Sequence, residues 1–434
     1  MRILFLNPVG ILGGAERALV DLLACLRTQE PALSLHLIAG TDGPLVETAR
    51  GLGVEARVLA LPDRLSALGD SGLREQGRAG LFRFAREVAP TPLLLARYGL
   101  DLRRAVRDAV PDLLHSNGIK THLLSAATTG LPIPRVWHVH DFLGERPLVR
   151  RALSGLHHLA SAAIANSQAV GNDARTVLRN VPVHVVPNGV DVERFSPAVG
   201  DSARTVLGNS VPTGEERSSP DMGDGAWLDA LAGLPPAPPG TLRVGLVATY
   251  ARWKGHDVFL EAAALLTRQA PSLPVRFYLV GAPLYRTAGS QFTDAELRER
   301  VERHGLTGRV GFVPFQPEPA RVYRALDVFV HASTRREPFG LTIAEALACG
   351  RAAVISKSSG AAEALRDGED VLAIEPGDAN TLAAALRRLL EDAALRDTLG
   401  RAARHTAVRR FSRERYARDI LQVYRSLVSA RGHS

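Results

Sequence analysis

Two glutamates, Glu337 and Glu345, are the residues of this sequence whose spacing says most about chemistry. A carboxylate accepts hydrogen bonds, so a pair of carboxylates can hold the hydroxyl groups of two sugars. Along one continuous helix, residues eight positions apart are separated by about 12 Å. Two glutamates at this spacing would ordinarily be solvated surface groups. The residues between them favour a binding site instead.

Those residues predict a strand that leads into the N-terminus of a helix. The apolar run 328–331 is typical of a strand, and Gly350 stands where a helix ending near Cys349 would stop. Pro338 fits the first turn, where its missing N–H is not needed. The free amides of the first turn are a site for phosphate. They belong to Phe339, Gly340, Leu341 and Thr342. This segment therefore predicts a diphosphate held between two hydroxyl-binding carboxylates.

Two cations follow another predicted strand, 242–249. Arg252 and Lys254 lie in the loop before the helical run 258–269, at the edge where parallel sheets bind ligands. Of 53 basic residues only three are lysine, so a lysine in this loop suggests that a compact point charge is needed. An isolated Arg-x-Lys would be a solvated loop. Together with the glutamate segment, it predicts neutralisation of a diphosphate.

The first part of the chain carries weaker signals. Gly13 and Gly14 join the first predicted strand to the first helix and let a ligand approach the backbone, although they form no dinucleotide-binding fingerprint. His138 and His140 lie on one side of the strand 135–140. A metal site would need a third ligand that the sequence does not identify. We therefore expect packing or a polar contact with substrate.

Strand–helix alternation occurs twice and predicts an α/β protein with two doubly wound, Rossmann-like parallel-sheet domains that face each other across a cleft. The first series of apolar runs is 3–7, 35–39, 56–61, 113–116, 136–140, 162–166 and 183–187. The second is 242–249, 276–280, 310–314, 328–331, 352–356 and 371–374. A Pro- and Gly-rich stretch between the series predicts a linker or insertion. The expected divisions are 1–196, 197–240, 241–410 and a C-terminal helix at 411–434 that crosses back to the first domain.

Composition narrows the function classes. A chain of 434 residues with 46% apolar and 23% charged residues is globular, not disordered or fibrous. Two cysteines exclude a disulfide framework and a thiolate metal cluster. No apolar run reaches the roughly 18 residues that span a bilayer, and the start lacks a signal-peptide pattern, so we expect a cytoplasmic protein. The net charge of +8 favours anionic partners, but without aromatic interleaving or a recognised motif we expect no nucleic acid.

One segment, 72–110, breaks the alternation. Its pattern is helical, apolar and dense in arginine. A basic amphipathic helix can lie on an anionic membrane or form a lid over an acceptor. More often such a segment is a helical hairpin that packs on its own domain. Peripheral contact with the inner membrane surface through 72–110 is therefore the secondary interpretation.

In order along nearly the whole chain, these motifs resemble the retaining glycosyltransferases of family 4, also called group 1, which have the GT-B fold. The most specific motif is 337–345, and the second is 188–191 at the domain junction. The others are 13–16, 140–141, 165–167, 252–255, 279–281, 331–333 and 376–378.

The resemblance implies a role for each site residue. Glu337 would bind hydroxyls of the donor sugar, and Glu345 would bind the ribose hydroxyls of the nucleotide. Lys254, an arginine and the amides of 339–342 would hold the diphosphate. His140 would meet the transferred sugar from the other side of the cleft.

Two further positions concern the phosphates. Gly14, with Gly13 beside it, would let the acceptor and the phosphates approach the first helix. Many family members have an arginine five residues before the lysine, where this chain has Thr249. Arg252 is the residue expected to replace that arginine as the second phosphate clamp.

The implied reaction is transfer of a sugar, with retention, from a UDP- or GDP-linked donor to a hydroxyl of a glycan, a lipid-linked or a small-molecule acceptor. No Asp-x-Asp cluster is present to bind a divalent cation, and a helix dipole with Lys254 and Arg252 can neutralise the leaving diphosphate. We therefore expect no metal and no cofactor. Two alternatives stay open: a GT-B sugar-nucleotide epimerase, and a non-catalytic subunit that binds sugar nucleotides or glycans.

Overall fold

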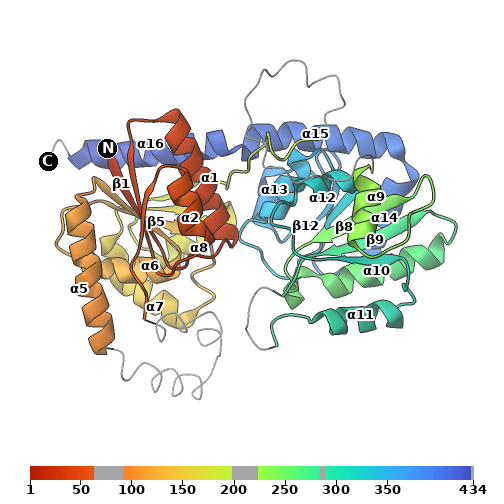
Figure 1. Cartoon of the computed structure of the whole chain (residues 1–434), viewed down its shortest axis with the longest axis horizontal. Coiled ribbons are helices and arrows are strands. Elements are labelled where there is room, and N and C mark those ends of the chain that lie inside the picture. Colours follow the sequence, from red (N-terminus) through yellow and green to blue (C-terminus); the bar gives the residue numbers. More distant parts are fainter. Residues whose placement is uncertain (63–91, 198–222, 284–288, 432–434) are drawn as a thin grey trace. The chain divides into compact units, whose positions relative to one another are not determined.

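The computed structural model describes residues 1–62, 92–197, 223–283 and 289–431 (Figure 1). It divides into two compact units: a first unit of Met1–Gly189 with Ser412–Ser434, and a second unit of Val190–Phe411. Each unit contains one parallel sheet with helices on both of its faces (Figure 1). The two predicted series of strands correspond one for one to the strands of these sheets. The predicted α/β class with two doubly wound domains is therefore confirmed.

The first unit has a seven-stranded sheet in the order β3-β2-β1-β4-β5-β6-β7. Its strands are β1 Arg2–Asn7, β2 Ser34–Ala39, β3 Glu55–Val58, β4 Leu113–Asn117, β5 Arg135–Val139, β6 Ala162–Ala165 and β7 Val183–Val185. Every residue of β4, β5 and β6 is buried, as expected for parallel strands covered on both faces. The polar residues of these strands therefore need partners inside the protein.

Seven longer helices in the described part of the chain accompany this sheet. They are α1 Gly14–Gln29, α2 Pro44–Gly51, α5 Pro92–Ala109, α6 Ile119–Leu124, α7 Pro147–Leu156, α8 Gln168–Val177 and α16 Arg413–Arg431. Helix α5 packs Tyr98, Leu102 and Val106 into a cluster with residues of β1 and β4. The described part of 72–110 is thus a packing helix, and 72–91 lies outside the described residues. Among the described helices, none is both long and apolar enough to cross a bilayer.

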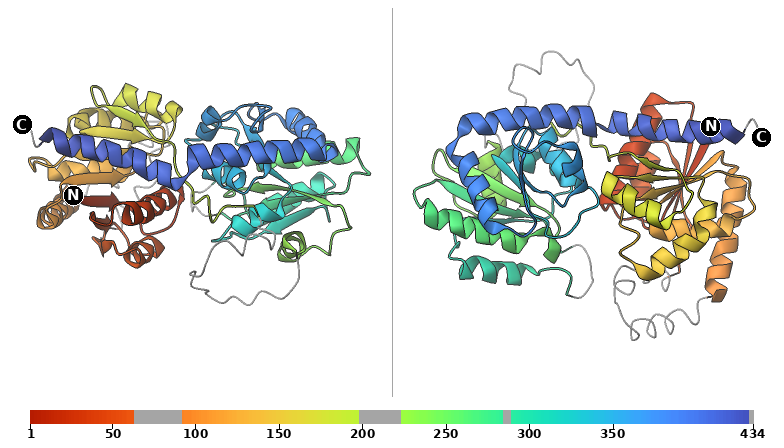
Figure 2. Two further views of the ribbon diagram at one scale, coloured as in Figure 1. Left: turned by 90° about the horizontal axis from the view of Figure 1, so that it is seen from above. Right: turned by 180° about the vertical axis from the view of Figure 1, so that it is seen from behind.

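The last helix of the chain completes the core of the first unit. Helix α16 packs against α1 and buries Tyr416, Ile420 and Tyr424 in the cluster that contains β1 and β2. Its start is capped by Ser412, whose Oγ accepts from the amide of Arg415 at 3.4 Å. Figure 2 shows α16, which leads to the C-terminus, lying along this unit.

The second unit has a six-stranded sheet in the order β10-β9-β8-β11-β12-β13. Its strands are β8 Leu242–Val247, β9 Val275–Val280, β10 Val310–Val313, β11 Val328–His331, β12 Ala352–Ser356 and β13 Leu372–Ile374. Its helices include α9 Asp224–Leu231, α10 His256–Gln269, α11 Asp294–Arg303, α12 Ala320–Ala325, α13 Leu341–Ala348, α14 Ala379–Glu391 and α15 Ala393–Phe411. Strands β8 and β11 are neighbours, so the loops that follow them meet at one edge of the sheet.

Part of the expected linker, 197–240, is integrated into this second unit. Helix α9 buries Leu228 against strand β9, and the Asp229 carboxylate pairs with Arg243 at 2.7 Å and with Arg276 at 3.0 Å. The helix has a single short apolar face between Gly- and Pro-rich stretches, so its sequence resembles a linker until its partners are known.

Candidate functional site

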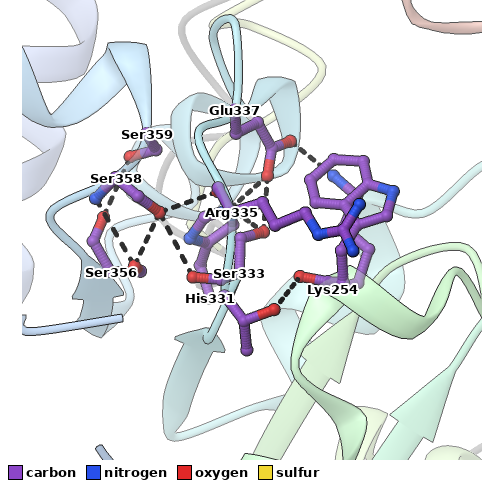
Figure 3. A network of polar contacts seen from close by, with 10 residues as sticks. Lys254, His331, Ser333, Arg335, Glu337, Ser356, Ser358 and Ser359 are labelled. Carbon is purple, nitrogen blue, oxygen red and sulfur yellow. Dashed lines mark hydrogen bonds and ion pairs between the residues drawn. The ribbon is translucent and has the colours of Figure 1, made fainter. Parts of the chain in front are cut away.

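A buried carboxylate in the loop after β11 has three partners among the described residues (Figure 3). Glu337 Oε2 accepts from Ser333 Oγ at 2.6 Å and lies 2.7 Å from His331 Nε2, and Oε1 is paired with the Lys254 ammonium. Burial alone would raise the pKa of Glu337, but Lys254 and His331 outweigh it and hold the pKa well below its ordinary value. A lowered pKa keeps the Glu337 carboxylate ionised, so that it accepts hydrogen bonds.

The backbone after strand β8 places Lys254 beside this carboxylate. Gly255 has φ +83°, and a Cβ at this position would collide with the carbonyl oxygen of Ala332 at the end of β11. The neighbouring Trp253 carbonyl accepts from the amide of Thr334 at 2.8 Å, and the Trp253 ring lies 4.3 Å from the Lys254 ammonium. Glycine at 255 thus allows the two loops to touch.

Helix α13 begins later than the sequence predicts. It starts at Leu341 rather than near Pro338, because Gly340 has φ +97° and acts as the N-cap. Glu337 lies in an extended segment instead, where its amide donates to Ser358 O at 2.9 Å and its carbonyl accepts from Gly360 N at 2.9 Å. The distance expected for one continuous helix between the two glutamates therefore does not apply.

The predicted amides are nevertheless free at the start of α13. Within the described part of the chain, the backbone N–H groups of Phe339, Gly340, Leu341 and Thr342 donate to no acceptor, whereas that of Ile343 donates to Gly340 O at 3.0 Å. The Phe339 ring is buried against Phe411, with their centroids 5.6 Å apart, which anchors the turn. Free amides at a helix N-terminus can hold an anion.

Glu345, on α13, is buried and accepts a hydrogen bond from the neighbouring helix. Its Oε2 accepts from the hydroxyl of Tyr323 at 2.6 Å, and Tyr323 itself is fully buried on α12. Tyr323 was not predicted from the sequence, and neither were His331 and Ser333 as partners of Glu337. The short motif 331–333 was the available signal for the latter pair.

The structure directs Arg252 away from the Glu337 network. Its guanidinium pairs with Glu296 of α11 at 2.5 Å, donates to Gly289 O at 3.0 Å and lies 4.4 Å from the Phe292 ring centroid. Thr249 is half-buried in the loop after β8. Figure 3 shows a second arginine that the sequence reasoning overlooked, Arg335, in the loop that carries Ser333 and Glu337.

The remaining predicted site residues lie in the first unit. Gly13 is the N-cap of α1 and Gly14 is its first residue. The Gly13 amide donates to Glu16 Oε2 at 3.2 Å, and a Cβ at Gly13 would lie 2.8 Å from that oxygen. His140 follows β5, with Nε2 2.6 Å from Asn117 Oδ1. The predicted residues thus form two groups, one on each sheet.

His140, itself partly buried, lies beside the buried imidazoles of His138 and His115. The His138 ring lies 4.1 Å from that of His140 and 5.2 Å from that of His115, whose Nδ1 is 2.7 Å from the Tyr424 hydroxyl of α16. Burial lowers the pKa of His115 to about 3 and that of His140 to about 4. No group of His, Cys, Asp or Glu among the described residues has an arrangement suited to a metal ion.

Comparison with known proteins identifies the family. Residues 12–194 match Glycosyltransferase Family 4, and residues 236–406 match Glycosyl transferases group 1. The D-inositol 3-phosphate glycosyltransferase of Salinispora tropica is 30% identical over 365 residues, which cover 79% of this chain and 70% of that enzyme. The chain belongs to the group 1 glycosyltransferases. The family resemblance found in the sequence is confirmed. Membership of this family makes the protein a transferase.

Other relatives agree on the class and the fold. The D-inositol 3-phosphate glycosyltransferase of Jonesia denitrificans is 30% identical over 289 residues, which cover 65% of this chain and 61% of that enzyme. The Anabaena protein HepE, solved in complex with UDP, superposes with a TM-score of 0.74 at 24% identity, covering 98% of this glycosyltransferase and all of HepE. The two Rossmann-like units are therefore those of a GT-B fold.

Proposed function

We propose that this glycosyltransferase moves a sugar from a nucleotide-diphosphate sugar to a hydroxyl of its acceptor, with retention. The observation that carries the proposal is the Glu337 network beside the free amides of 339–342. An ionised acceptor, a lysine and a row of backbone donors at one sheet edge complement a sugar joined to a diphosphate.

The network leaves capacity for a substrate. Two carboxylate oxygens offer roughly four acceptor positions. Of the Glu337 oxygens, Oε2 faces His331 and Ser333, and Oε1 faces Lys254. One position on Oε1 is left to accept from a hydroxyl of the donor sugar. Lys254, held against that same oxygen, would neutralise the leaving phosphate together with the amides of 339–342.

Glu345 is proposed to bind the ribose of the nucleotide. Its Oε2 is occupied by Tyr323, which fixes the carboxylate, and carboxylates are suited to the paired hydroxyls of a ribose. In the first unit, Gly13 and Gly14 are proposed to face the phosphates and the acceptor. His140 is proposed to face the transferred sugar. These assignments follow from the family resemblance and from the position of each residue at the carboxyl ends of the strands.

The relatives suggest which donor to test first. HepE has been solved with UDP and with UDP-glucose, and curated relatives are D-inositol 3-phosphate glycosyltransferases. We therefore place UDP-sugars first among the donors, and a polyol or sugar hydroxyl first among the acceptors.

A thermal-shift panel of UDP-, GDP- and ADP-sugars tests the donor site. A donor at about 100 times its dissociation constant should stabilise the protein by about 2.7 kcal/mol. The shift should shrink in Glu345→Gln, which keeps the size of the side chain but removes its charge. If no donor shifts the wild-type transition, the proposal fails. Release of nucleoside diphosphate without acceptor would further separate an enzyme from a subunit that only binds.

A further inference from the structure

Two buried asparagines connect the turn at Gly13 and Gly14, through Glu16, to His140. Asn7 ends strand β1, Asn117 ends the neighbouring strand β4, and His140 follows the next strand, β5. Both asparagines are 1% exposed. Buried amides of this kind must be hydrogen-bonded, and these two form a continuous chain of bonds that ends at the imidazole.

The orientation of the Asn7 amide follows from a backbone carbonyl. Asn7 Nδ2 lies 2.6 Å from Val9 O, and a carbonyl oxygen can only accept, so this end of the amide must be the donor. The same nitrogen faces Glu16 Oε1 at 3.3 Å. Because Val9 fixes the orientation, the assignment holds whether or not Glu16 carries a proton. Asn7 Oδ1 is therefore an acceptor that points to Asn117.

Asn117 then has only one orientation that satisfies its neighbours. Its Nδ2 donates to Asn7 Oδ1 at 2.7 Å and faces a second carbonyl, Ala15 O, at 3.5 Å. Exchanging Nδ2 and Oδ1 of Asn117 would place an oxygen against two other acceptors, Asn7 Oδ1 and Ala15 O. Asn117 Oδ1 consequently faces His140 Nε2 at 2.6 Å, where it can only accept.

From this chain of bonds we infer that Asn117, oriented by Asn7, is a positioning residue that holds His140 as the neutral tautomer with its proton on Nε2. His140 Nδ1 is enclosed without a hydrogen-bond partner in the described part of the chain, as a bare lone pair would be. A proton at that nitrogen would be a buried donor with no acceptor, which is costly. The catalytic meaning of this inference rests on the proposed function. In that function, His140 is held in place to contact the substrate and does not transfer a proton.

The tautomer can be observed without any substrate. In a spectrum of the full-length protein with ¹⁵N-labelled histidines, the imidazole nitrogens report which of them is protonated. The His140 signals are those that vanish in His140→Asn. At neutral pH we expect a protonated Nε2 and an unprotonated Nδ1. A proton on Nδ1, or an imidazolium, would overturn the inference.

Two substitutions at Asn117 separate positioning from general support of the fold. Asn117→Ala removes the acceptor, so the proton should redistribute between the two His140 nitrogens. Asn117→Asp keeps an oxygen that faces Nε2, so Nε2 should stay protonated. Both variants should lower the unfolding temperature, because both leave Asn7 without its donor. If the Nε2 proton is retained in Asn117→Ala, or lost equally in both variants, Asn117 does not act through this bond.

Asn166→Ala is the matched control. Asn166 is also a buried asparagine at the carboxyl end of a strand in this sheet, and its Oδ1 has no partner within the described residues. Its loss should leave the His140 tautomer unchanged. A tautomer change in Asn166→Ala as large as that in Asn117→Ala would count against the inference.

Kinetics connect the tautomer to the reaction. With a working donor, Asn117→Ala should lower kcat on the order of 10-fold and leave the donor KM within about twofold, since small misplacements of catalytic groups mainly slow turnover. A raised KM with unchanged kcat would overturn the positioning role. If the wild type transfers no sugar at all, the proposed function fails, and the spectrum still decides the tautomer.

Discussion

Lys254 and Glu337 form a partly buried ion pair although 83 positions separate them in the chain. They meet because β8 and β11 are neighbours in the sheet, so that the loops following these strands reach the same edge. Gly255 removes the side chain that would otherwise hold the two loops apart. The pair is therefore a consequence of sheet topology and one glycine.

Arg335 should contribute more to binding of the diphosphate than Arg252. The guanidinium of Arg252 is already paired with Glu296 and stacked on Phe292, whereas Arg335 is exposed and has no carboxylate partner among the described residues. Losing a charged hydrogen bond costs roughly 1.5–3 kcal/mol, so Arg335→Ala should raise the dissociation constant of UDP about 10-fold or more. Calorimetric titration with UDP measures the dissociation constant of both variants. A larger loss in Arg252→Ala would restore the assignment made from the sequence.

Activity should survive excess chelator. The Lys254 ammonium and the amides of 339–342 supply the positive potential that a divalent cation would otherwise provide to the leaving diphosphate. The initial rate should therefore be the same with EDTA as without it. Loss of activity with EDTA, followed by recovery on adding Mg²⁺ or Mn²⁺, would reveal a metal requirement.

Much of the architecture could be predicted from the sequence because it depends on local patterns. The apolar runs located the strands that the structure describes, and Gly13, Lys254 and Glu337 each lie in a connection that follows a strand, at the edge where ligands of such sheets bind. The partners of these residues could not be predicted in the same way. Tyr323 reaches Glu345 from another helix, and such a contact depends on tertiary packing that has no periodic signature.

The start of α13 could not be predicted from the sequence for a second reason. Pro338 is compatible with the first turn of a helix, yet Gly340 adopts a left-handed conformation and the helix begins after it. Glycine can adopt either sign of φ, so its conformation is set by surroundings that the sequence alone does not show. Here those surroundings are the backbone bonds from Glu337 to Ser358 and Gly360.

Removing the last helix should damage the first unit. A chain that stops after Phe411 lacks α16, whose Tyr416, Ile420 and Tyr424 are fully buried in the core of that unit. The apolar faces that α16 covers would be exposed, and large exposed apolar patches promote aggregation. We expect loss of solubility and activity together, measured by the soluble fraction on expression and by turnover. A soluble truncated protein with normal turnover would contradict this packing role.

Stability should fall as the solution becomes acidic. The ordinary histidine pKa is 6.5, and burial lowers that of His115 to about 3, so below pH 6.5 the unfolded chain binds a proton that the folded chain does not. The contribution of His115 to the free energy of unfolding is complete above pH 6.5. It is lost, by about 1.4 kcal/mol per pH unit, as the pH falls toward the pKa of His115 in the folded protein.

Urea unfolding at about pH 7.5 and at about pH 5 measures this slope. His115→Gln is the control, because the amide can still bond to the Tyr424 hydroxyl but does not titrate in this range. The slope should be shallower in this variant. A wild-type free energy of unfolding that stays constant between the two pH values would contradict the neutral, buried state of His115.

The most direct test of the donor site compares nucleoside diphosphate release in the wild type, Glu337→Gln and Glu345→Gln. The first carboxylate is proposed to hold the donor sugar and the second to hold the ribose, and each lost bond to a charged acceptor costs roughly 1.5–3 kcal/mol. With UDP-, GDP- and ADP-sugars as substrates, at least one donor should be turned over by the wild type. For that donor, Glu337→Gln should mainly lower kcat and Glu345→Gln should mainly raise KM, each by about 10-fold or more. Equal kinetics in all three proteins, or no release from any donor, would contradict the proposed function.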